Sequence, residues 1–367
     1  MKDEKRKILF VTTAFGKGGA EKQLFKLAKY FDGEGFSVLI ISMLKLNMFE
    51  EELSESDIRF IPLKMDESKL NIFKYFSIVK SFAPDVVISF LYTANILARI
   101  GKYRMKYPLI TSIRSGTFGS KARNVLCKLT TNADNFTVLN SFSVLQNMIK
   151  NGLVDKNKSL NIPNIIQLPN YSNDEKLQIR KALRNELKIS GDTFVFLFVG
   201  HCRPEKDYET LFQAIAQLQG DFKLIMIGNL LGQMWPSQRI DELGLSTKID
   251  LMGKRDDVDR FYLAADSLVL SSISEGLPNA IMEAMSLELA IVATKVGGVL
   301  DLVEDRSTGI LCNAGDATDL SNSMQQMMRL TTKEREKMGE NGRKKISGEF
   351  DKAVVCNKWH NLVLKLT

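Results

Sequence analysis

Short apolar runs alternate with segments of helical periodicity along almost the whole chain. In its first part, strands are expected at residues 7–13, 36–43, 58–62, 85–90, 109–113 and 135–139. Helices are expected between and after them, at residues 20–32, 69–82, 93–102, 121–131 and 141–151. Strands that alternate with helices in this way predict a parallel sheet covered by helices on both faces.

The alternation stops at residues 162–173, which are rich in Pro and Asn, and then starts again. Further strands are expected at residues 194–200, 222–228, 249–252, 267–270, 291–294 and 310–311. Further helices are expected at residues 208–217, 236–243, 257–264 and 280–285, and over 316–366 with a break at 348–351. We therefore predict an α/β fold of two doubly wound domains, residues 1–165 and 171–350. The last segment, about 351–367, is a candidate to pack back on the first domain.

The charge of the chain is unevenly divided between these two parts. Residues 1–170 carry 25 Lys and Arg against 15 Asp and Glu, whereas the remainder carries 25 against 28. This difference indicates an anionic partner for the first part, either nucleic acid or anionic lipid. Because no nucleic-acid motif with interleaved aromatic residues is present, we expect no nucleic-acid partner. The four cysteines have neither paired nor metal-ligand spacing, as is typical of a reducing cytosol.

One stretch, residues 271–283, has the pattern of a strand exit, a tight loop and a helix start. Gly276 allows the backbone to approach a ligand, and Pro278 suits the first turn of a helix. The N-terminus of a helix attracts anions such as phosphate. Glu275 and Glu283 could then accept hydrogen bonds from the hydroxyls of a sugar. The alternative is a capping turn with two exposed acids.

Two other loops have a composition suited to phosphate. Residues 15–21 form a glycine-rich turn, but Glu21 stands where the third glycine of a dinucleotide motif would fall, so that interpretation is weak. Residues 200–206 bring Arg203 and Lys206 to the end of a strand, where they could neutralise a diphosphate. The alternatives are a turn that needs small residues and a solvated basic loop. In parallel sheets ligands bind beyond the carboxyl ends of the strands, so two facing domains would form one cleft containing these loops.

The order of these motifs resembles that of the nucleotide-sugar-dependent glycosyltransferases of family 4, and the resemblance covers nearly the whole chain. It implies the GT-B fold, with two facing Rossmann-like domains and an interdomain cleft. It also implies retaining transfer of a hexose from a nucleoside diphosphate to an acceptor hydroxyl. The motifs that carry it lie at residues 18–21, 203–206, 275–285 and 292–298.

The resemblance also implies roles for single residues. Glu275 would bind hydroxyls of the donor sugar, and Glu283 would bind the ribose. Arg203 and Lys206 would stabilise the leaving diphosphate. The remaining donor contacts would come from the backbone of Gly276, Leu277 and Asn279 and from the turn at Gly18 and Gly19. The resemblance implies a donor that is a nucleoside-diphosphate sugar, no metal and no other cofactor, so the acids at 257 and 259 are expected to mark a helix start.

The chain departs from the family pattern at several positions. His201 stands where the family often has Arg, so Arg203 is the expected cation. Many members have a His near the acceptor after the fifth strand; here Arg114 is the nearest candidate, with a surface cation as the alternative. The chain has only His201 and His360, so no histidine of the first domain can act as a base. Glu288 and Ala290 replace the usual Gly and Pro, which favours a structural turn there.

The helix expected at residues 69–82 has apolar residues on both of its faces. Phe73 lies among lysines, including Lys69, on the face opposite the core, as is typical of helices at a membrane surface. The alternative is a core helix with a solvated face. We expect peripheral contact of the first domain with an anionic membrane and a cytoplasmic location, at the cytoplasmic face of the inner membrane. We also expect a lipid-linked saccharide acceptor in surface polysaccharide or glycolipid synthesis. Two alternative functions remain, a catalytically silent scaffold of the same fold and a nucleotide-sugar epimerase.

Overall fold

The computed structural model describes residues 5–16, 18–68 and 71–367. Lys17 and the predicted membrane residue Lys69 lie outside this set. The chain forms two compact units, one of Met1–Ile165 with Lys352–Thr367 and one of Ile166–Asp351.

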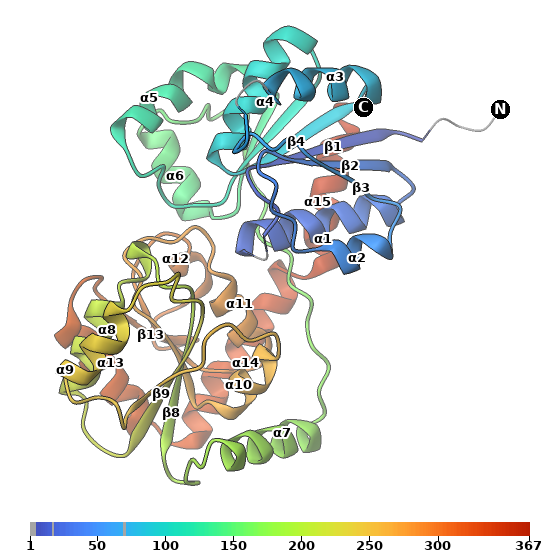
Figure 1. The fold of residues 1–367 in the computed structure, drawn as a ribbon. Helices are drawn as coiled ribbons and strands as arrows, with labels where there is room; N and C mark the ends of the chain where they lie inside the picture. The colour runs from blue at the N-terminus through green and yellow to red at the C-terminus, as the bar shows by residue number, and fades with distance from the viewer. Residues whose placement is uncertain (1–4, 17, 69–70) are drawn as a thin grey trace. The chain divides into compact units, whose positions relative to one another are not determined.

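The first unit is built on a parallel sheet in the order β3-β2-β1-β4-β5-β6-β7 (Figure 1). Its strands are β1 (Lys7–Thr12), β2 (Ser37–Ser42), β3 (Arg59–Pro62), β4 (Val86–Phe90), β5 (Leu109–Ile113), β6 (Phe136–Leu139) and β7 (Ser159–Asn161). Its helices are α1 (Gly19–Gly33), α2 (Glu50–Ser54), α3 (Ile72–Phe82), α4 (Tyr92–Met105), α5 (Lys121–Thr130), η2 (Thr131–Ala133), α6 (Phe142–Lys150) and α15 (Lys352–Leu364).

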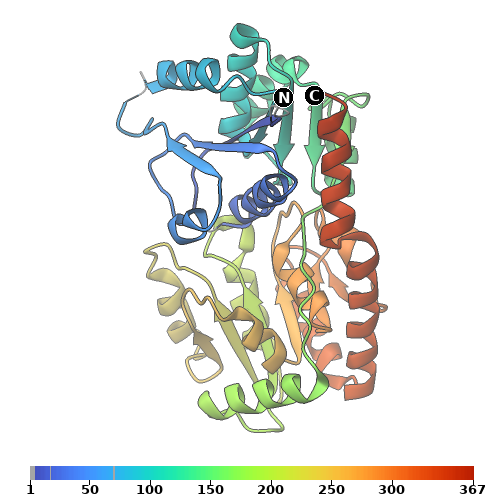
Figure 2. The same cartoon turned by 90° about the vertical axis from the view of Figure 1, so that its right-hand side faces the viewer.

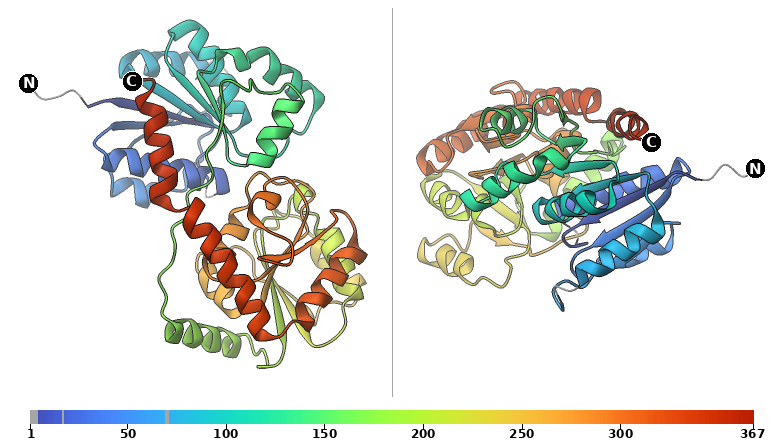
Figure 3. Two further views of the ribbon diagram at one scale, coloured as in Figure 1. Left: turned by 180° about the vertical axis from the view of Figure 1, so that it is seen from behind. Right: turned by 90° about the horizontal axis from the view of Figure 1, so that it is seen from above.

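Helices cover both faces of this sheet because its central strands are apolar on both sides. Along β1, Ile8 and Phe10 pack with α1 and α15, whereas Leu9 and Val11 pack with α3 and α4. Figures 2 and 3 show α15, in red, along the first unit and beside α1. Trp359 of α15 is only 1% exposed, so this helix belongs to the core.

The second unit is built on a parallel sheet in the order β10-β9-β8-β11-β12-β13. Its strands are β8 (Phe194–Val199), β9 (Phe222–Ile227), β10 (Ile249–Leu251), β11 (Ser267–Leu270), β12 (Ile291–Thr294) and β13 (Gly309–Cys312). Its helices are α7 (Asn173–Glu186), η3 (Pro204–Lys206), α8 (Tyr208–Gln217), α9 (Trp235–Glu242), α10 (Val258–Ala264), α11 (Asn279–Ser286), α12 (Val299–Leu302), α13 (Ala317–Arg329) and α14 (Thr332–Glu349).

The strand order reverses once in each sheet, and this reversal determines which loops meet. In the first unit the chain turns back between β1 and β4, and in the second between β8 and β11. Connections that leave neighbouring strands in opposite directions at such a point open a crevice at the carboxyl edge of the sheet. In the second unit, the loop after β8 contains Arg203 and Lys206, and the loop after β11 contains Glu275 and leads into α11, which contains Glu283.

Most expected elements are confirmed, but the linker expected at residues 162–173 is shorter in the structure, because its last residue belongs to a helix. Its last residue, Asn173, is the first residue of α7, whose capping box is formed by Ser172 and Glu175. The prediction also missed α2, which buries none of its residues, and the short strand β7.

Candidate functional site

The loops that follow β8 and β11 are joined by hydrogen bonds at the point where the strand order reverses. The Ser271 hydroxyl donates to the carbonyl oxygen of Lys206 at 2.8 Å. The amide of Ile273 donates to the carbonyl oxygen of Glu205 at 2.9 Å. Two stretches about 65 residues apart in sequence therefore form one surface at the edge of the sheet.

Lys206 and Glu275 form an ion pair at the centre of this surface. Lys206 Nζ lies 2.5 Å from Glu275 Oε1, and the Ser272 hydroxyl donates to the same oxygen at 2.7 Å. The two charged side chains are 18% and 11% exposed, so solvent screens their attraction little. Arg203, by contrast, is 56% exposed, and its Nη1 lies 4.0 Å from Glu205 Oε1. The two predicted cations thus share a loop but differ in environment: Lys206 contacts the predicted sugar-binding acid, and Arg203 extends into solvent.

The second acid, Glu283, lies about one turn into α11, which begins at Asn279 directly after Pro278. Its Oε2 accepts a hydrogen bond from the Tyr262 hydroxyl at 2.9 Å. Burial, together with the negative charge of Glu283, raises the pKa of Tyr262 well above its ordinary value. The phenol therefore stays protonated and keeps the carboxylate oriented. Tyr262 could not be recognised from the sequence, because within an apolar helix it has the pattern of a core residue.

Two glycines allow the loops of this surface to approach each other closely. A Cβ atom at Gly298 would lie 1.9 Å from the carbonyl oxygen of Gly276. A Cβ atom at Gly228 would lie 1.9 Å from the carbonyl oxygen of Gly200. Any side chain at either position would push neighbouring loops apart, so both glycines support the shape of the site.

The other departures from the family pattern have structural roles here. His201 Nδ1 accepts a hydrogen bond from the amide of Asn229 at 3.0 Å and so connects the loops after β8 and β9. Glu288 has a φ of 63° and pairs with Lys176 at 2.5 Å, which stabilises the turn after α11. Asp257 precedes α10, and hydrogen bonds from Arg255 lower its pKa to about 2. Its position directly before α10 confirms the helix start expected at this acid.

In the first unit, α1 begins at Gly19, and the carbonyl oxygen of Gly18 accepts a hydrogen bond from the amide of Lys22 at 2.9 Å. The turn that contains Gly18 and Gly19 thus follows the central strand β1 and precedes a helix, as the motif predicted. Whether it contacts a diphosphate stays a prediction.

Arg114 follows β5 directly and is half-buried, unlike the surface cation that was its alternative interpretation. Its guanidinium carbon lies 4.6 Å from the ring centroid of Phe90 and 5.7 Å from that of Trp359. Its Nη1 donates to Asn164 Oδ1 at 3.0 Å. Burial lowers the pKa of Arg114 to about 9, so the side chain remains charged at neutral pH.

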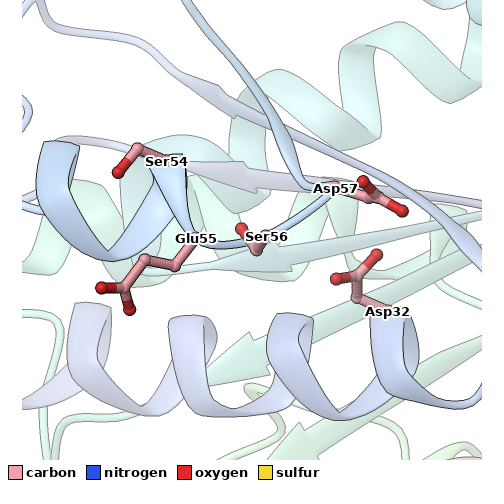
Figure 4. Close-up of a pocket in the computed structure, with 5 residues that line it drawn as sticks. All are labelled: Asp32, Ser54, Glu55, Ser56 and Asp57. Carbon is pink, nitrogen blue, oxygen red and sulfur yellow. The ribbon is translucent and has the colours of Figure 1, made fainter.

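A hollow of about 490 Å³ in the first unit has an acidic lining, unlike the loops described above, which contain cations. It is lined by Asp32, Ser54, Glu55, Ser56 and Asp57, and Figure 4 shows the carboxylates of Asp32 and Asp57 pointing into it. Asp57 precedes β3 and Asp32 lies at the end of α1, so the hollow is at the amino edge of the sheet. Its acidic lining would repel a phosphate-carrying ligand.

Comparison with known proteins places this geometry in context. Residues 179–345 match the family model described as glycosyl transferases group 1. An α-1,4-N-acetyl-D-galactosaminyltransferase of Campylobacter jejuni, named for its acceptor GalNAc-alpha-(1->4)-GalNAc-alpha-(1->3)-diNAcBac-PP-undecaprenol, is 25% identical over 98% of this chain and 99% of its own length. The N-acetyl-alpha-D-glucosaminyl L-malate synthase of Bacillus anthracis is 24% identical over 64% of this chain and 66% of its own.

Solved structures resemble the chain over nearly its whole length. Anabaena Alr3699/HepE, determined in complex with UDP and glucose, has a TM-score of 0.85 at 20% identity, covering 98% of this chain and 100% of that one. A sucrose-phosphate synthase of Thermosynechococcus elongatus has a TM-score of 0.82 at 17% identity, covering 98% and 99%. These likenesses confirm the architecture of two parallel-sheet domains expected from the sequence.

Proposed function

We propose that this chain, a glycosyltransferase with the GT-B fold, is a retaining hexosyltransferase of family 4 that uses a nucleoside-diphosphate sugar. The observation that carries the proposal is the Lys206–Glu275 pair beside the N-terminus of α11, at the reversal point of the second sheet. This arrangement offers an acid for sugar hydroxyls next to a cation and a helix dipole for a diphosphate.

Each part of the donor then has a defined position in the proposal. Glu275 accepts hydrogen bonds from the hexose hydroxyls, and Glu283, held by Tyr262, accepts those of the ribose. Backbone amides at Gly276, Leu277 and Asn279 bind the sugar and the distal phosphate. Lys206 and Arg203 neutralise the diphosphate.

In the proposed reaction the bond between the anomeric carbon and the phosphate oxygen breaks, and the acceptor oxygen bonds to the same carbon on the same face. The acceptor proton passes to the departing phosphate oxygen. Because the acceptor oxygen attacks the anomeric carbon directly, no covalent enzyme intermediate forms. Lys206 and the positive end of α11 stabilise the charge that develops on the diphosphate. These fixed charges would perform the role of a metal ion, so we propose a reaction that needs no metal.

For the acceptor, we propose a saccharide carried on a lipid, in the synthesis of a surface polysaccharide or glycolipid. Support comes from the full-length relative, which is named for an acceptor linked to undecaprenol through PP. Other relatives are named for lipopolysaccharide core and capsular polysaccharide biosynthesis.

A screen of nucleotide sugars by thermal shift tests the donor proposal, because a bound ligand raises the melting temperature. One nucleotide sugar should stabilise the protein and be hydrolysed or transferred. Replacing Glu283 by alanine should weaken nucleotide affinity about tenfold to a hundredfold by removing charge-assisted hydrogen bonds to the ribose. Glu242→Ala, at a 63% exposed acid of the same unit, is the control and should bind like the wild type. Stabilisation by no nucleotide sugar would contradict the proposal.

Contact with an anionic membrane is proposed for the surface formed by α3, α4 and α5, since α4 contacts both of its neighbours. These three helices carry eight Lys and Arg, of which Arg99 is buried, and no acid. The apolar side chains most exposed on these helices are Phe73 at 62%, Tyr103 at 65%, Val125 at 56% and Leu129 at 71%. No helix among the described residues is long and apolar enough to cross a bilayer. Apolar side chains among cations would suit partial insertion between anionic headgroups at the cytoplasmic face of the membrane.

The double substitution Val125→Ser with Leu129→Ser should weaken binding to phosphatidylglycerol vesicles about tenfold or more, since each side chain loses part of its apolar burial. Phe73→Ser should act in the same direction. The matched control is Leu177→Ser, which removes a 49% exposed leucine from α7 of the second unit. Co-sedimentation that is the same for all these variants would exclude this surface.

A further inference from the structure

Three strands of the first unit are followed by polar side chains that form one cluster. Arg114 follows β5, Asn140 follows β6, and Asn164 lies shortly after β7. Asn164 Oδ1 accepts hydrogen bonds from Arg114 Nη1 at 3.0 Å and from Asn140 Nδ2 at 3.2 Å. Both asparagines are only 3% exposed, so the guanidinium is held in place by a packed structure at the carboxyl edge of the sheet.

The charge of Arg114 has no counter-charge among the described residues of the first unit. Burial alone accounts for its lowered pKa, with no contribution from a carboxylate, and its Nε is buried without a hydrogen-bond partner. A second buried arginine of the same unit, Arg99, does have a counter-charge: it donates hydrogen bonds to both carboxylate oxygens of Asp134. The rings of Phe90 and Trp359 offset only part of the cost of removing a guanidinium from water.

We infer that Arg114 forms a binding site for an oxyanion, a phosphate or a carboxylate carried by the acceptor. A planar guanidinium is suited to such groups because it can donate two parallel hydrogen bonds to them. An incoming oxyanion would supply the missing counter-charge. The donor diphosphate is assigned to the second unit, so we assign the anion at Arg114 to the acceptor. To that extent the inference rests on the proposed function.

The chain contains a natural reporter for this site. It has two tryptophans, so Trp235→Phe leaves Trp359, which contacts Arg114, as the only one. Titration of that variant with inorganic pyrophosphate, or with malate as a dicarboxylate, should change the Trp359 emission, because a bound anion offsets the guanidinium charge beside the indole ring. A response to pyrophosphate identifies a phosphate-type group, and a response to malate identifies a carboxylate.

Substitutions in the same background separate this site from the donor site. Arg114→Gln should lower the affinity for the anion that changes the Trp359 emission by about tenfold to a hundredfold, as expected for loss of charge-assisted hydrogen bonds. Arg114→Lys keeps the charge but cannot donate two parallel hydrogen bonds, so it should give an intermediate affinity. This variant keeps the test decisive if the glutamine variant does not fold. Lys206→Gln, in the other unit, should leave the Trp359 response intact.

Absence of any Trp359 response to either anion, or a response that Arg114→Gln leaves unchanged, would overturn the inference. Loss of the response in Lys206→Gln alone would also overturn it, because the anion would then bind at the donor site. Donor hydrolysis by the wild-type chain is measured separately. If hydrolysis fails while the Arg114-dependent response persists, the proposed function is wrong and the oxyanion site remains.

Discussion

Replacing Glu275 by glutamine should reduce glycosyl transfer by roughly a hundredfold to ten-thousandfold while nucleotide affinity stays within a few-fold of the wild type. The amide keeps the shape of the side chain but loses the charge that accepts hydrogen bonds from the donor hydroxyls. Lys206, freed from its partner at 2.5 Å, would remain available to the diphosphate. Transfer at saturating donor and nucleotide binding by calorimetry measure the two effects.

The neighbouring acid offers a matched control for this experiment. Glu205 is 42% exposed and contributes its carbonyl oxygen, not its carboxylate, to the contact with Ile273. Glu205→Gln should therefore be nearly neutral. Small, equal losses from the variants of Glu275 and Glu283 would contradict the separate roles proposed for these acids.

The largest effect on stability is expected at Asp134, where replacement by alanine should destabilise the first unit by about 3–5 kcal/mol. Its carboxylate accepts hydrogen bonds from Arg99 and from the hydroxyls of Thr111 and Thr137. The side chains of Arg99 and Asp134 are 1% and 0% exposed, so the substitution leaves a buried guanidinium unpaired. In a Trp235→Phe background, urea unfolding followed through Trp359 reports on the first unit.

A double variant tests whether the cost comes from the orphaned charge. Arg99→Met combined with Asp134→Leu removes both charges and should recover much of the stability lost in Asp134→Ala. The free energy of unfolding lost in the double variant could instead equal the sum of the losses in Arg99→Met and Asp134→Leu alone. Packing, and not the unpaired charge, would then account for the effect.

Strands and helices with strongly apolar faces could be predicted closely from the sequence. The bounds of β11, β12 and α8 match the expected residues because turn residues delimit short apolar segments there. Helix α7 was missed because only Leu183 and Arg184 are buried along it, which leaves little periodicity. The pattern Ser172-Asn-Asp-Glu175 was the available signal, since it is a capping box.

The candidate site could be predicted as a set of residues but not as a set of contacts. The loops of Lys206 and Glu275 were identified separately, each from its composition. Their ion pair depends on β11 lying beside β8, a strand order that periodicity does not encode. The environment of Arg114 was out of reach for a similar reason, because Trp359 comes from a helix far along the chain.

The placement of α15 has a consequence for how the protein is made. The first unit takes its last core helix from residues 352–364, so its apolar sheet face lacks Trp359 and its neighbours until the whole second unit has been synthesised. The second unit, continuous from Ile166 to Asp351, has all of its residues earlier. We therefore expect the second unit to fold first on the ribosome although it is synthesised second. Meanwhile the nascent first unit would expose an apolar surface that chaperones can bind.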